Sequence, residues 1–483
     1  MSLLRRSLTT KSGDMEQLTT LDAGFLEAED SDPHVSLAIG AVAVLAGPMP
    51  DFDSLAADLA DRIRAVPRFR QVLHTQPLDL GAPRWADDDA FDVFHHVRRA
   101  ALPRPGDDEA LFRWVAEVME RRLDRERPLW ECWVVDGLVH HRWAILMKVH
   151  HCIADGVAAT RLLTQLADDR GGEIFGTGIH PARPRRSASR LPALPLNPID
   201  WVSLAWRTSR GVTSAATQVV QGALELVDGL LRPAAASSLT GPVTDMRRFA
   251  AVEVSLSDVE RIGARFGVTV NDVALAAITD SYRTMLLQRG ESLAPNSLRT
   301  LVPVSVRSSD ATGKTDNRVS VMLPYLPVDK ADPVEQLKKV HARLTKAKGS
   351  GQRQAGNVLL AAANALPFPL TAWTVRALTR LPQRGIVTLA TNVPGPRRRI
   401  RIAGREVVRL LPVPPLALQL RTGIAILSYA DHLAFGIIGD YDAAPDVEEI
   451  AGGIRRAITR LTGLASGHWR STPVGTLALV QGG

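Results

Sequence analysis

A nearly continuous apolar run, Trp143–Val149, most constrains what this chain can fold into, because it has the length and composition of a buried strand. The run leads into His150 and His151, and the residues that follow, 157–168, space their leucines as a helix does. The histidine pair is therefore predicted to lie at a strand-to-helix turn, where a rigid element can aim an imidazole into a cavity. Because histidine titrates near neutral pH, one fixed ring nitrogen there can remove a proton from a hydroxyl or an amine.

The seven residues from His150 to Gly156 read H-H-x-x-x-D-G. A lone buried histidine is usually a satisfied core residue, and Asp155 before a helix could be an N-cap. Two adjacent histidines, followed by Asp-Gly after a hydrophobic strand, favour a catalytic base over packing. A zinc site is disfavoured, because adjacent side chains diverge and no third ligand stands at a helix or ribbon spacing.

Length and composition bound the other possibilities. With 483 residues, the chain is long enough for two or three domains. A net charge of +7 suits nucleic acid, an anionic membrane or the phosphates of coenzyme A, and charge alone does not choose among them. The low aromatic content, 5%, and the lack of a nucleic-acid module argue against nucleic acid. The two cysteines, Cys132 and Cys152, indicate no disulfide framework and fit a reducing cytoplasm.

Strand-like and helical segments alternate along the chain, which indicates an α/β fold. We predict a disordered extension over 1–14, an N-terminal domain with the histidine motif over 15–180, a linker with a helix over 181–240, a C-terminal domain over 241–465 and a tail over 466–483. The expected strands are 35–45, 133–139, 143–150, 299–306, 318–324, 420–429 and 432–441, and the expected helices are 52–65, 109–123, 157–168, 199–231 and 271–287.

No uninterrupted apolar run reaches the length of a transmembrane span. The nearest, 358–373, is broken by Asn364, Pro367 and Pro369. The helix over 199–231 is expected to pack on the body of the protein, with a lipid-interface role as the alternative. We therefore expect a peripheral protein rather than one that spans a bilayer.

Other motifs that carry catalysis or nucleotide binding are missing or incomplete. The sequence has no G-x-S-x-G nucleophile elbow, and the Gly-Lys-Thr at 313–315 lacks the upstream glycine of a P-loop. The histidine pairs at 95–96 and 140–141 are expected at the surface, the second in a hairpin turn. Without a covalent nucleophile, the remaining chemistry is direct attack on an activated donor such as an acyl thioester.

The histidine motif resembles that of the CoA-dependent acyltransferases, which include chloramphenicol acetyltransferases and the condensation domains of peptide synthetases. The chain as a whole resembles the bacterial wax ester synthase/diacylglycerol acyltransferases over about 15–463, with the motifs in the expected order. Departures such as Pro33, where methionine is common, and Thr240, where asparagine is common, bear on substrate preference. The matching stretches include L-T-T-L-D-A-G-F-L at 18–26, P-L-W at 128–130, N-D at 271–272, P-V-S-V-R at 303–307 and T-N-V-P-G-P at 391–396.

The resemblance implies two chloramphenicol-acetyltransferase-like α/β domains with a tunnel between them, and a role for each matching residue. His151 would be the general base, and His150 would orient the turn. Asn271 would stabilise the oxyanion or position the acyl chain, with a helix N-cap as the alternative. Asp155, Gly156 and Arg307 would shape the turn, with an ion pair between Asp155 and Arg307. The residues that contact substrate would be Pro128, Leu129, Trp130 and Asn392.

The implied reaction joins an acyl group from acyl-CoA to diacylglycerol or a fatty alcohol, and it needs no metal or redox cofactor. The protein would be a cytoplasmic monomer or homodimer attached peripherally to membranes or lipid droplets. Two alternatives stay open: a condensation-domain-like acyltransferase that uses carrier-protein thioesters, and a non-catalytic lipid-droplet protein.

Overall fold

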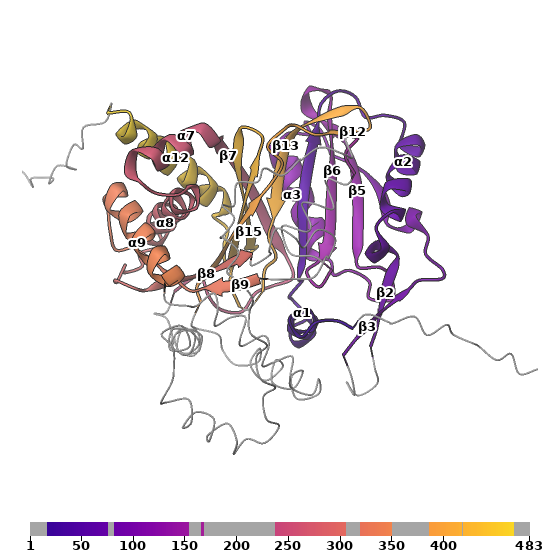
Figure 1. Ribbon diagram of the computed structural model, residues 1–483, viewed down its shortest axis with the longest axis horizontal. Coiled ribbons are helices and arrows are strands. Elements are labelled where there is room, and N and C mark those ends of the chain that lie inside the picture. Colours follow the sequence, from indigo (N-terminus) through magenta and orange to yellow (C-terminus); the bar gives the residue numbers. More distant parts are fainter. Residues whose placement is uncertain are drawn as a thin grey trace, which may run out of the picture.

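The computed structural model describes residues 17–75, 82–153, 166–168, 237–305, 319–349, 386–417 and 419–467. In this part of the chain, two large sheets stand side by side with helices packed against them (Figure 1). A separate two-stranded sheet pairs β2 (Gln71–His74) with β3 (Arg84–Asp87). The α/β architecture predicted from the sequence is therefore confirmed.

The apolar run of the sequence forms β6 (Arg142–His150), an interior strand of the first sheet, in which every residue after Arg142 is buried. Strands buried on both faces are apolar nearly throughout rather than alternating, which explains an apolar run that is interrupted only by Lys148. The sheet has the order β12-β13-β1-β6-β5-β4. Its other strands are β1 (Ala38–Leu45), β4 (Val97–Ala101), β5 (Trp130–Leu138), β12 (Arg401–Ile402) and β13 (Arg405–Val413), and its helices are α1 (Thr20–Ser31), α2 (Phe52–Arg64) and α3 (Asp108–Glu120).

One strand of the first sheet comes from the other half of the chain. β13 lies within the predicted C-terminal domain, yet it pairs antiparallel with β1, so that Gly40 faces Val413 and Ala43 faces Leu410. Conversely, helix α3 belongs to the N-terminal half of the chain but packs against β7 (Arg247–Ser255) of the second sheet. The two halves therefore share structural elements instead of meeting only at a surface.

The second sheet has the order β10-β8-β11-β14-β15-β7, with β9 paired to β8. Helices α8 and α12 pack against each other beside it and lie to the left of the strands in Figure 1. The remaining strands are β8 (Leu298–Ser305), β9 (Val319–Met322), β10 (Tyr325–Leu326), β11 (Thr388–Pro394), β14 (Thr422–Tyr429) and β15 (His432–Asp440), and the helices are α7 (Leu256–Phe266), α8 (Val270–Gln288), α9 (Pro333–Gly349) and α12 (Val447–Ala465).

The elements that periodicity predicted within the described residues fall close to the expected segments, whereas α1, α7, α9, α12, β7, β11 and β13 were not among the expected segments. Helix α3 ends at Glu120, before the predicted end at 123, and β9 is shorter than the strand predicted over 318–324. The extension at 1–14, the helices at 157–168 and 199–231 and the segment at 358–373 lie wholly or largely outside the described residues. The tunnel that the resemblance implies between the domains stays a prediction.

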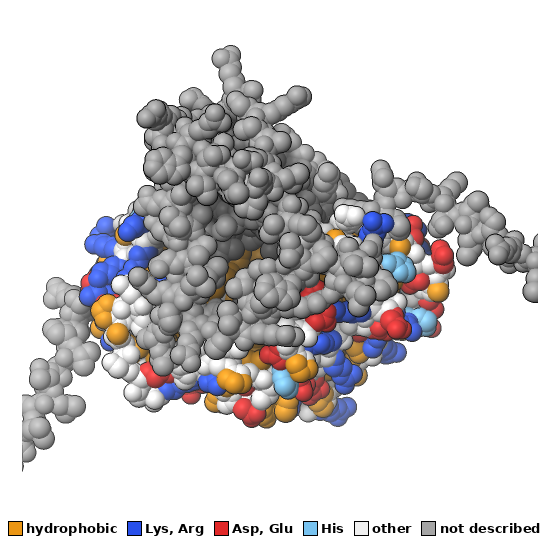
Figure 2. Space-filling view, turned by 90° about the horizontal axis from the view of Figure 1, so that it is seen from below, with side chains coloured by type: hydrophobic (Ala, Val, Ile, Leu, Met, Phe, Trp, Pro, Cys, Tyr) orange, Lys and Arg blue, Asp and Glu red, His pale blue; other side chains and the backbone are white. Residues whose placement is uncertain are grey.

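The surface of the described residues carries a basic region on α9, whose exposed side chains include Lys338, Lys346 and Lys348. In the view from below, Lys and Arg side chains gather at the left edge, the side on which Figure 1 places α9 (Figure 2). None of the described helices alone is long and apolar enough to cross a membrane. Helices α7 and α8 pass that test only as a pair, and they are bent by 100° relative to each other.

Candidate active site

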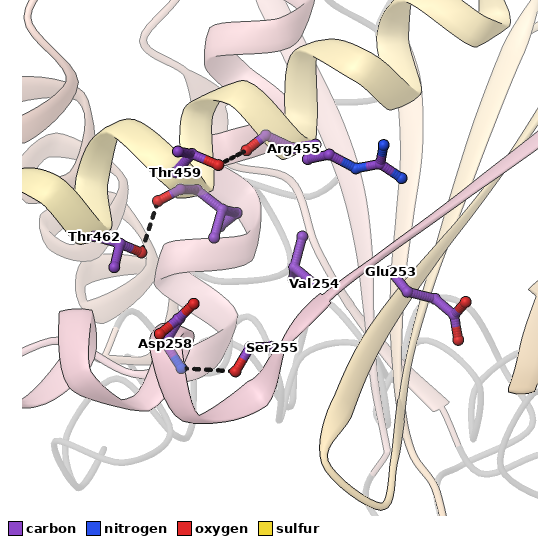
Figure 3. A pocket seen from close by; sticks show the side chains of 8 residues that line it. Glu253, Val254, Ser255, Asp258, Arg455, Thr459 and Thr462 are labelled. Atoms are coloured by element: carbon purple, nitrogen blue, oxygen red, sulfur yellow. Dashed lines mark hydrogen bonds between the residues drawn. The ribbon is translucent and has the colours of Figure 1, made fainter. Parts of the chain in front are cut away.

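A depression between β7, α7 and α12 in the second half of the molecule is not the candidate site, although it is a distinct hollow of the described surface (Figure 3). Its hydroxyls are occupied locally: Thr459 donates to the Arg455 carbonyl at 3.0 Å, and Ser255 accepts from the Asp258 N–H at 3.3 Å. A binding site needs polar groups that converge on a ligand. The hydroxyl groups here instead cap or brace the neighbouring helices.

The histidine turn lies at the end of β6, where neighbouring strands hold its backbone on both sides. The His150 N–H donates to the Leu129 carbonyl at 3.0 Å, and the His151 N–H donates to the Leu37 carbonyl at 3.0 Å. The Ile153 N–H then folds back onto the His150 carbonyl at 2.9 Å. The predicted strand-to-turn junction is thus confirmed up to Ile153, the last described residue before 166.

His150 is engaged at both ring nitrogens. Its Nδ1 accepts from the Cys152 N–H at 3.2 Å, and its Nε2 lies 3.3 Å from Oε2 of Glu29. The second contact is a close approach to the carboxylate rather than a well-aligned hydrogen bond. An Nδ1 that accepts an N–H carries no proton itself, so the ring proton lies on Nε2, facing the carboxylate. The two side chains are only 1% and 2% exposed, so this ring is committed to the protein rather than to a substrate.

Glu29, on α1, was not singled out from the sequence. Its Oε1 accepts from the Leu37 N–H at 3.0 Å, and its Oε2 pairs with Arg125 at 2.9 Å. Burial on its own would raise the pKa of Glu29, but the contacts with His150, Arg125 and the Leu37 N–H outweigh it and lower this pKa from 4.5 to about 2. A fixed negative charge therefore stands beside the histidine turn. An acidic residue within a helix carries no sequence signal that it is buried.

His151 has different surroundings. Its ring stacks on Phe25 of α1, with 4.1 Å between the ring centroids and 33° between the planes. Burial is the main reason that the pKa of His151 falls to about 4, and an interaction with the backbone of His151 itself partly opposes this effect. The residue keeps partial exposure, whereas its Nδ1 atom is buried. Near neutral pH this imidazole is uncharged and can accept a proton.

Two arginines after α3 hold α1 over the histidines. Arg122 donates from Nε to the Val35 carbonyl at 2.9 Å and from its guanidinium to the carbonyls of Glu29 and Asp32 at the end of α1. Arg125 pairs with Glu29 and, at 2.8 Å, with Asp30. These contacts fix the helix that supplies both Phe25 and Glu29 to the site.

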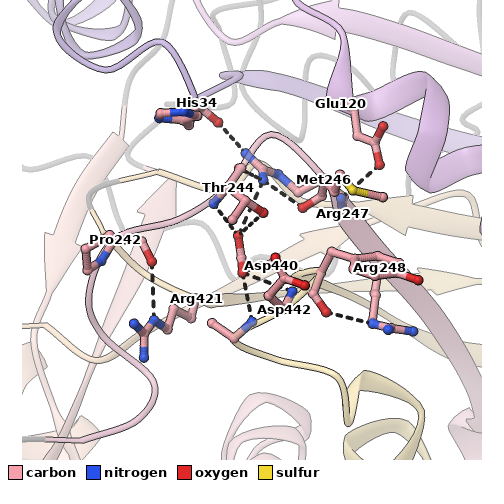
Figure 4. A network of polar contacts seen from close by, with 12 residues as sticks. His34, Glu120, Pro242, Thr244, Met246, Arg247, Arg248, Arg421, Asp440 and Asp442 are labelled. Atoms are coloured by element: carbon pink, nitrogen blue, oxygen red, sulfur yellow. Dashed lines mark hydrogen bonds and ion pairs between the residues drawn. The ribbon is translucent and has the colours of Figure 1, made fainter.

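A buried polar network joins the same region to the second sheet (Figure 4). The Arg247 guanidinium donates to the His34 carbonyl at 2.5 Å, and its backbone N–H donates to Oε1 of Glu120 at 2.9 Å. Asp440 accepts from the Thr244 hydroxyl at 2.8 Å and lies 3.9 Å from Arg247, with exposures of 1% and 2%. Because His34 follows α1 closely, this network couples the α1 region to the strands of the second half.

The Pro128–Trp130 segment is buried against the histidine turn. The Trp130 ring N–H donates to the Phe69 carbonyl at 2.9 Å, and the Trp130 ring stacks on His96 at 4.5 Å. The prediction that the histidine pair at 95–96 lies at the surface is wrong for His96. This side chain is 5% exposed, and its Nδ1 lies 2.8 Å from the Trp130 carbonyl oxygen. The pair at 140–141 does lie in an exposed turn between β5 and β6. Substrate contact by Pro128, Leu129 and Trp130 stays a prediction.

Asn271 and Asn392 meet although they are distant in the sequence. The Asn392 side-chain N–H donates to Oδ1 of Asn271 at 3.2 Å, from β11 to the first turn of α8. The alternative reading of Asn271 as an N-cap is wrong, because Thr269 caps α8 and forms a capping box with Asp272. Since the Oδ1 of Asn271 is used, its Nδ2 is the group that could donate to a developing oxyanion.

Three predicted site residues, Asp155, Gly156 and Arg307, lie outside the described residues, so the Asp155–Arg307 ion pair stays a prediction. Within the described ranges, no group of three His, Cys, Asp or Glu side chains is arranged to hold a metal ion.

Two family models match the chain in order. The model described as the wax ester synthase/diacylglycerol acyltransferase catalytic domain matches residues 18–274, and the WS/DGAT C-terminal domain matches residues 315–462. The chain is 54% identical over 467 residues to a Mycobacterium tuberculosis protein named as a probable diacylglycerol O-acyltransferase, a match that covers 96% of this chain and 100% of the relative. A second protein of that organism with the same enzyme name is 44% identical over 451 residues, covering 93% of this chain and 92% of the relative.

Solved structures give the same picture of the fold. The structure is similar to the wax ester synthase/diacylglycerol acyltransferase from Marinobacter aquaeolei VT8, with a TM-score of 0.65, 26% identity and coverage of 93% of this chain and 100% of that one. The first condensation domain of the CDA synthetase matches with a TM-score of 0.60 at 15% identity, covering 94% and 97%, which concerns the fold alone. The two-domain fold implied by the resemblance is confirmed, and by its sequence, its fold and its two matching domains the chain belongs to the wax ester synthase/diacylglycerol acyltransferase family of acyltransferases.

Proposed function

We propose that this protein transfers the acyl group of acyl-CoA to the hydroxyl of diacylglycerol or of a long-chain fatty alcohol, with His151 as the general base. The observation that carries the proposal is the difference between two adjacent histidines. The ring of His150 is held by Glu29 and the Cys152 N–H, whereas the ring of His151 is neutral and stacked on Phe25. Only the second ring is in a state to take a proton from a substrate.

The reaction proceeds by direct transfer. The acceptor hydroxyl gives its proton to His151 while its oxygen forms a bond to the thioester carbonyl carbon. The carbon–sulfur bond then breaks, and His151 returns the proton to the departing thiolate, which leaves as the thiol of coenzyme A. The side-chain amide of Asn271 is the candidate donor to the oxyanion between these steps. Acyl-CoA is a co-substrate, and no metal or redox cofactor enters the reaction.

Among the two acceptor classes, diacylglycerol is favoured, because relatives at 54% and 44% identity over nearly the whole chain are named as diacylglycerol O-acyltransferases. The product is then a triacylglycerol. A fatty alcohol would instead give a wax ester, the other activity in the family's description.

A turnover assay with separate acceptors tests both parts of the proposal. Thiol release from palmitoyl-CoA is followed with a diacylglycerol or with hexadecanol, and the products are identified by chromatography. His151→Ala should lower turnover by roughly 10²–10⁴-fold while the thermal unfolding transition is kept, since that is the usual contribution of a general base. Wild-type turnover by His151→Ala would overturn the assignment of the base. Turnover with hexadecanol alone would overturn the choice of diacylglycerol.

We also propose that the protein works in the cytoplasm, attached peripherally to a membrane or a lipid droplet. Its lipid substrates are insoluble, its net charge is +7, and α9 exposes a lysine-rich face. Lysines near an anionic surface contribute about 1 kcal/mol each to binding. In a flotation assay, the protein should rise with anionic vesicles at low salt and less so at high salt, and charge reversal at Lys338, Lys346 and Lys348 should weaken this binding. Protein that stays wholly in the soluble fraction at low salt would contradict the proposal.

A further inference from the structure

The carboxylate of Glu29 is placed to control which nitrogen of His150 carries the proton. It cannot swing away, because its Oε1 accepts from the Leu37 N–H and its Oε2 is paired with Arg125. The side chain is 2% exposed, so water does not screen its charge. A fixed negative charge 3.3 Å from Nε2 favours a proton on that nitrogen.

The proton on Nε2 leaves Nδ1 of His150 as an acceptor, and this atom braces the turn. It accepts from the Cys152 N–H at 3.2 Å, so His151 lies between the two residues that this bond joins. The other tautomer would place an N–H on Nδ1 facing the Cys152 N–H, and two donors would then oppose each other. The hydrogen bond that the Cys152 N–H donates to His150 therefore depends on the His150 tautomer.

We propose that Glu29 is a positioning residue for acyl transfer, which acts through His150: its charge fixes the His150 tautomer, and that tautomer holds the turn that aims His151. The proposal rests on the assignment of His151 as the base. Arg125 takes part by holding the carboxylate in place. Glu29 itself needs no contact with either substrate.

Glu29→Gln is the direct test, because it keeps the size of the side chain and an acceptor for the Leu37 N–H but removes the charge. Outer partners that orient the ligands of metal sites typically contribute 10–100-fold, and by analogy kcat should fall by about that factor. The KM for acyl-CoA should change by less than about threefold, because substrate contacts are untouched. Asp30→Asn is the matched control: Asp30 is the adjacent carboxylate and shares Arg125, but no contact with His150 is described for it. An unchanged kcat in Glu29→Gln, or an equal loss in Asp30→Asn, would overturn the proposal.

A double-mutant cycle separates positioning from general loss of structure. In His150→Asn, the side-chain oxygen can accept from the Cys152 N–H without any tautomer, so a charge at Glu29 is no longer needed. Adding Glu29→Gln to this variant should therefore change kcat by less than about twofold, in contrast to its effect on the wild type. If the two losses simply multiply, Glu29 does not act through His150.

A spectroscopic measurement tests the tautomer without any turnover. The ring ¹⁵N signals of His150, assigned by their loss in His150→Asn, should show a protonated Nε2 and an unprotonated Nδ1 in the wild-type protein near neutral pH. The opposite tautomer would overturn the proposal even if no variant at Glu29 folds. Full activity of His151→Ala would instead remove the proposed function and leave the measured tautomer intact, so the two failures are distinguishable.

Discussion

Lys148 offers a test of how much a buried charge costs this fold. It lies on β6, two residues before the end of the strand, and is completely buried; its Nζ donates to the carbonyls of Val118, at 2.8 Å, and Arg121, at the end of α3. Burial lowers the pKa of Lys148 from 10.5 to about 8, although the nearby charges of Glu131 and Glu29 raise it in part. The folded protein therefore holds this proton less tightly than the unfolded chain does.

The direction of the pH effect follows from proton binding. Below pH 8 the folded state keeps the buried ammonium at its full cost, which is about 3 kcal/mol for a pKa lowered from 10.5 to about 8. Between pH 8 and pH 10.5 the unfolded chain binds more protons, so stability rises with pH, and at pH 10 only about 1 kcal/mol of the cost is left. The neutral amine still has two N–H donors, so both hydrogen bonds to α3 survive deprotonation.

Lys148→Met removes the buried charge and both hydrogen bonds to α3. Near pH 7, removing the buried charge stabilises the fold, but two buried carbonyls are left without a hydrogen-bond donor, and each costs about 1–3 kcal/mol. The net change in the free energy of unfolding should therefore be small or moderately destabilising. From pH 7 to pH 10 the wild type should gain about 2 kcal/mol over the variant. Urea unfolding followed by tryptophan fluorescence at several pH values measures this gap, with Lys338→Met, an exposed lysine of α9, as the control for removing one lysine. A gap that stays constant from pH 7 to pH 10 would refute the reasoning.

Three further predictions concern the site and its support. Burial lowers the pKa of His151 to about 4, and the base acts only when it is unprotonated. On acidification, kcat/KM should therefore fall only near pH 4. A fall of kcat/KM that begins near pH 6.5 would contradict this. Asn271→Asp keeps an acceptor for Asn392 but repels an oxyanion, so turnover should fall by about 10²-fold or more with an unchanged melting temperature, whereas near-full turnover would exclude the oxyanion role. Trp130→Phe leaves the Phe69 carbonyl without its donor and should lower the free energy of unfolding by about 1–3 kcal/mol in chemical denaturation, and a loss below about 0.5 kcal/mol would show that the bond matters little.

Periodicity predicted most elements near the histidine pair, because a strand buried on both faces is apolar throughout and an amphipathic helix repeats every three to four residues. It could not predict that β13 joins β1, since the choice of a pairing partner depends on distant segments and leaves no local pattern. The same limit applies to Asn271 and Asn392, which the sequence named separately and the fold brought to 3.2 Å.

The order of residues along the chain was enough to predict that a histidine pair ends a buried strand, and the resemblance of its motifs indicated the family. The difference between the two histidines follows only from the fold. Glu29 reaches His150 because α1 is clamped over the end of β6, and Lys148 is tolerated in the core because α3 ends beside it. Burial and hydrogen-bond partners are set by segments far apart along the chain, so the charge state of each group is a property of the fold and not of its sequence neighbours.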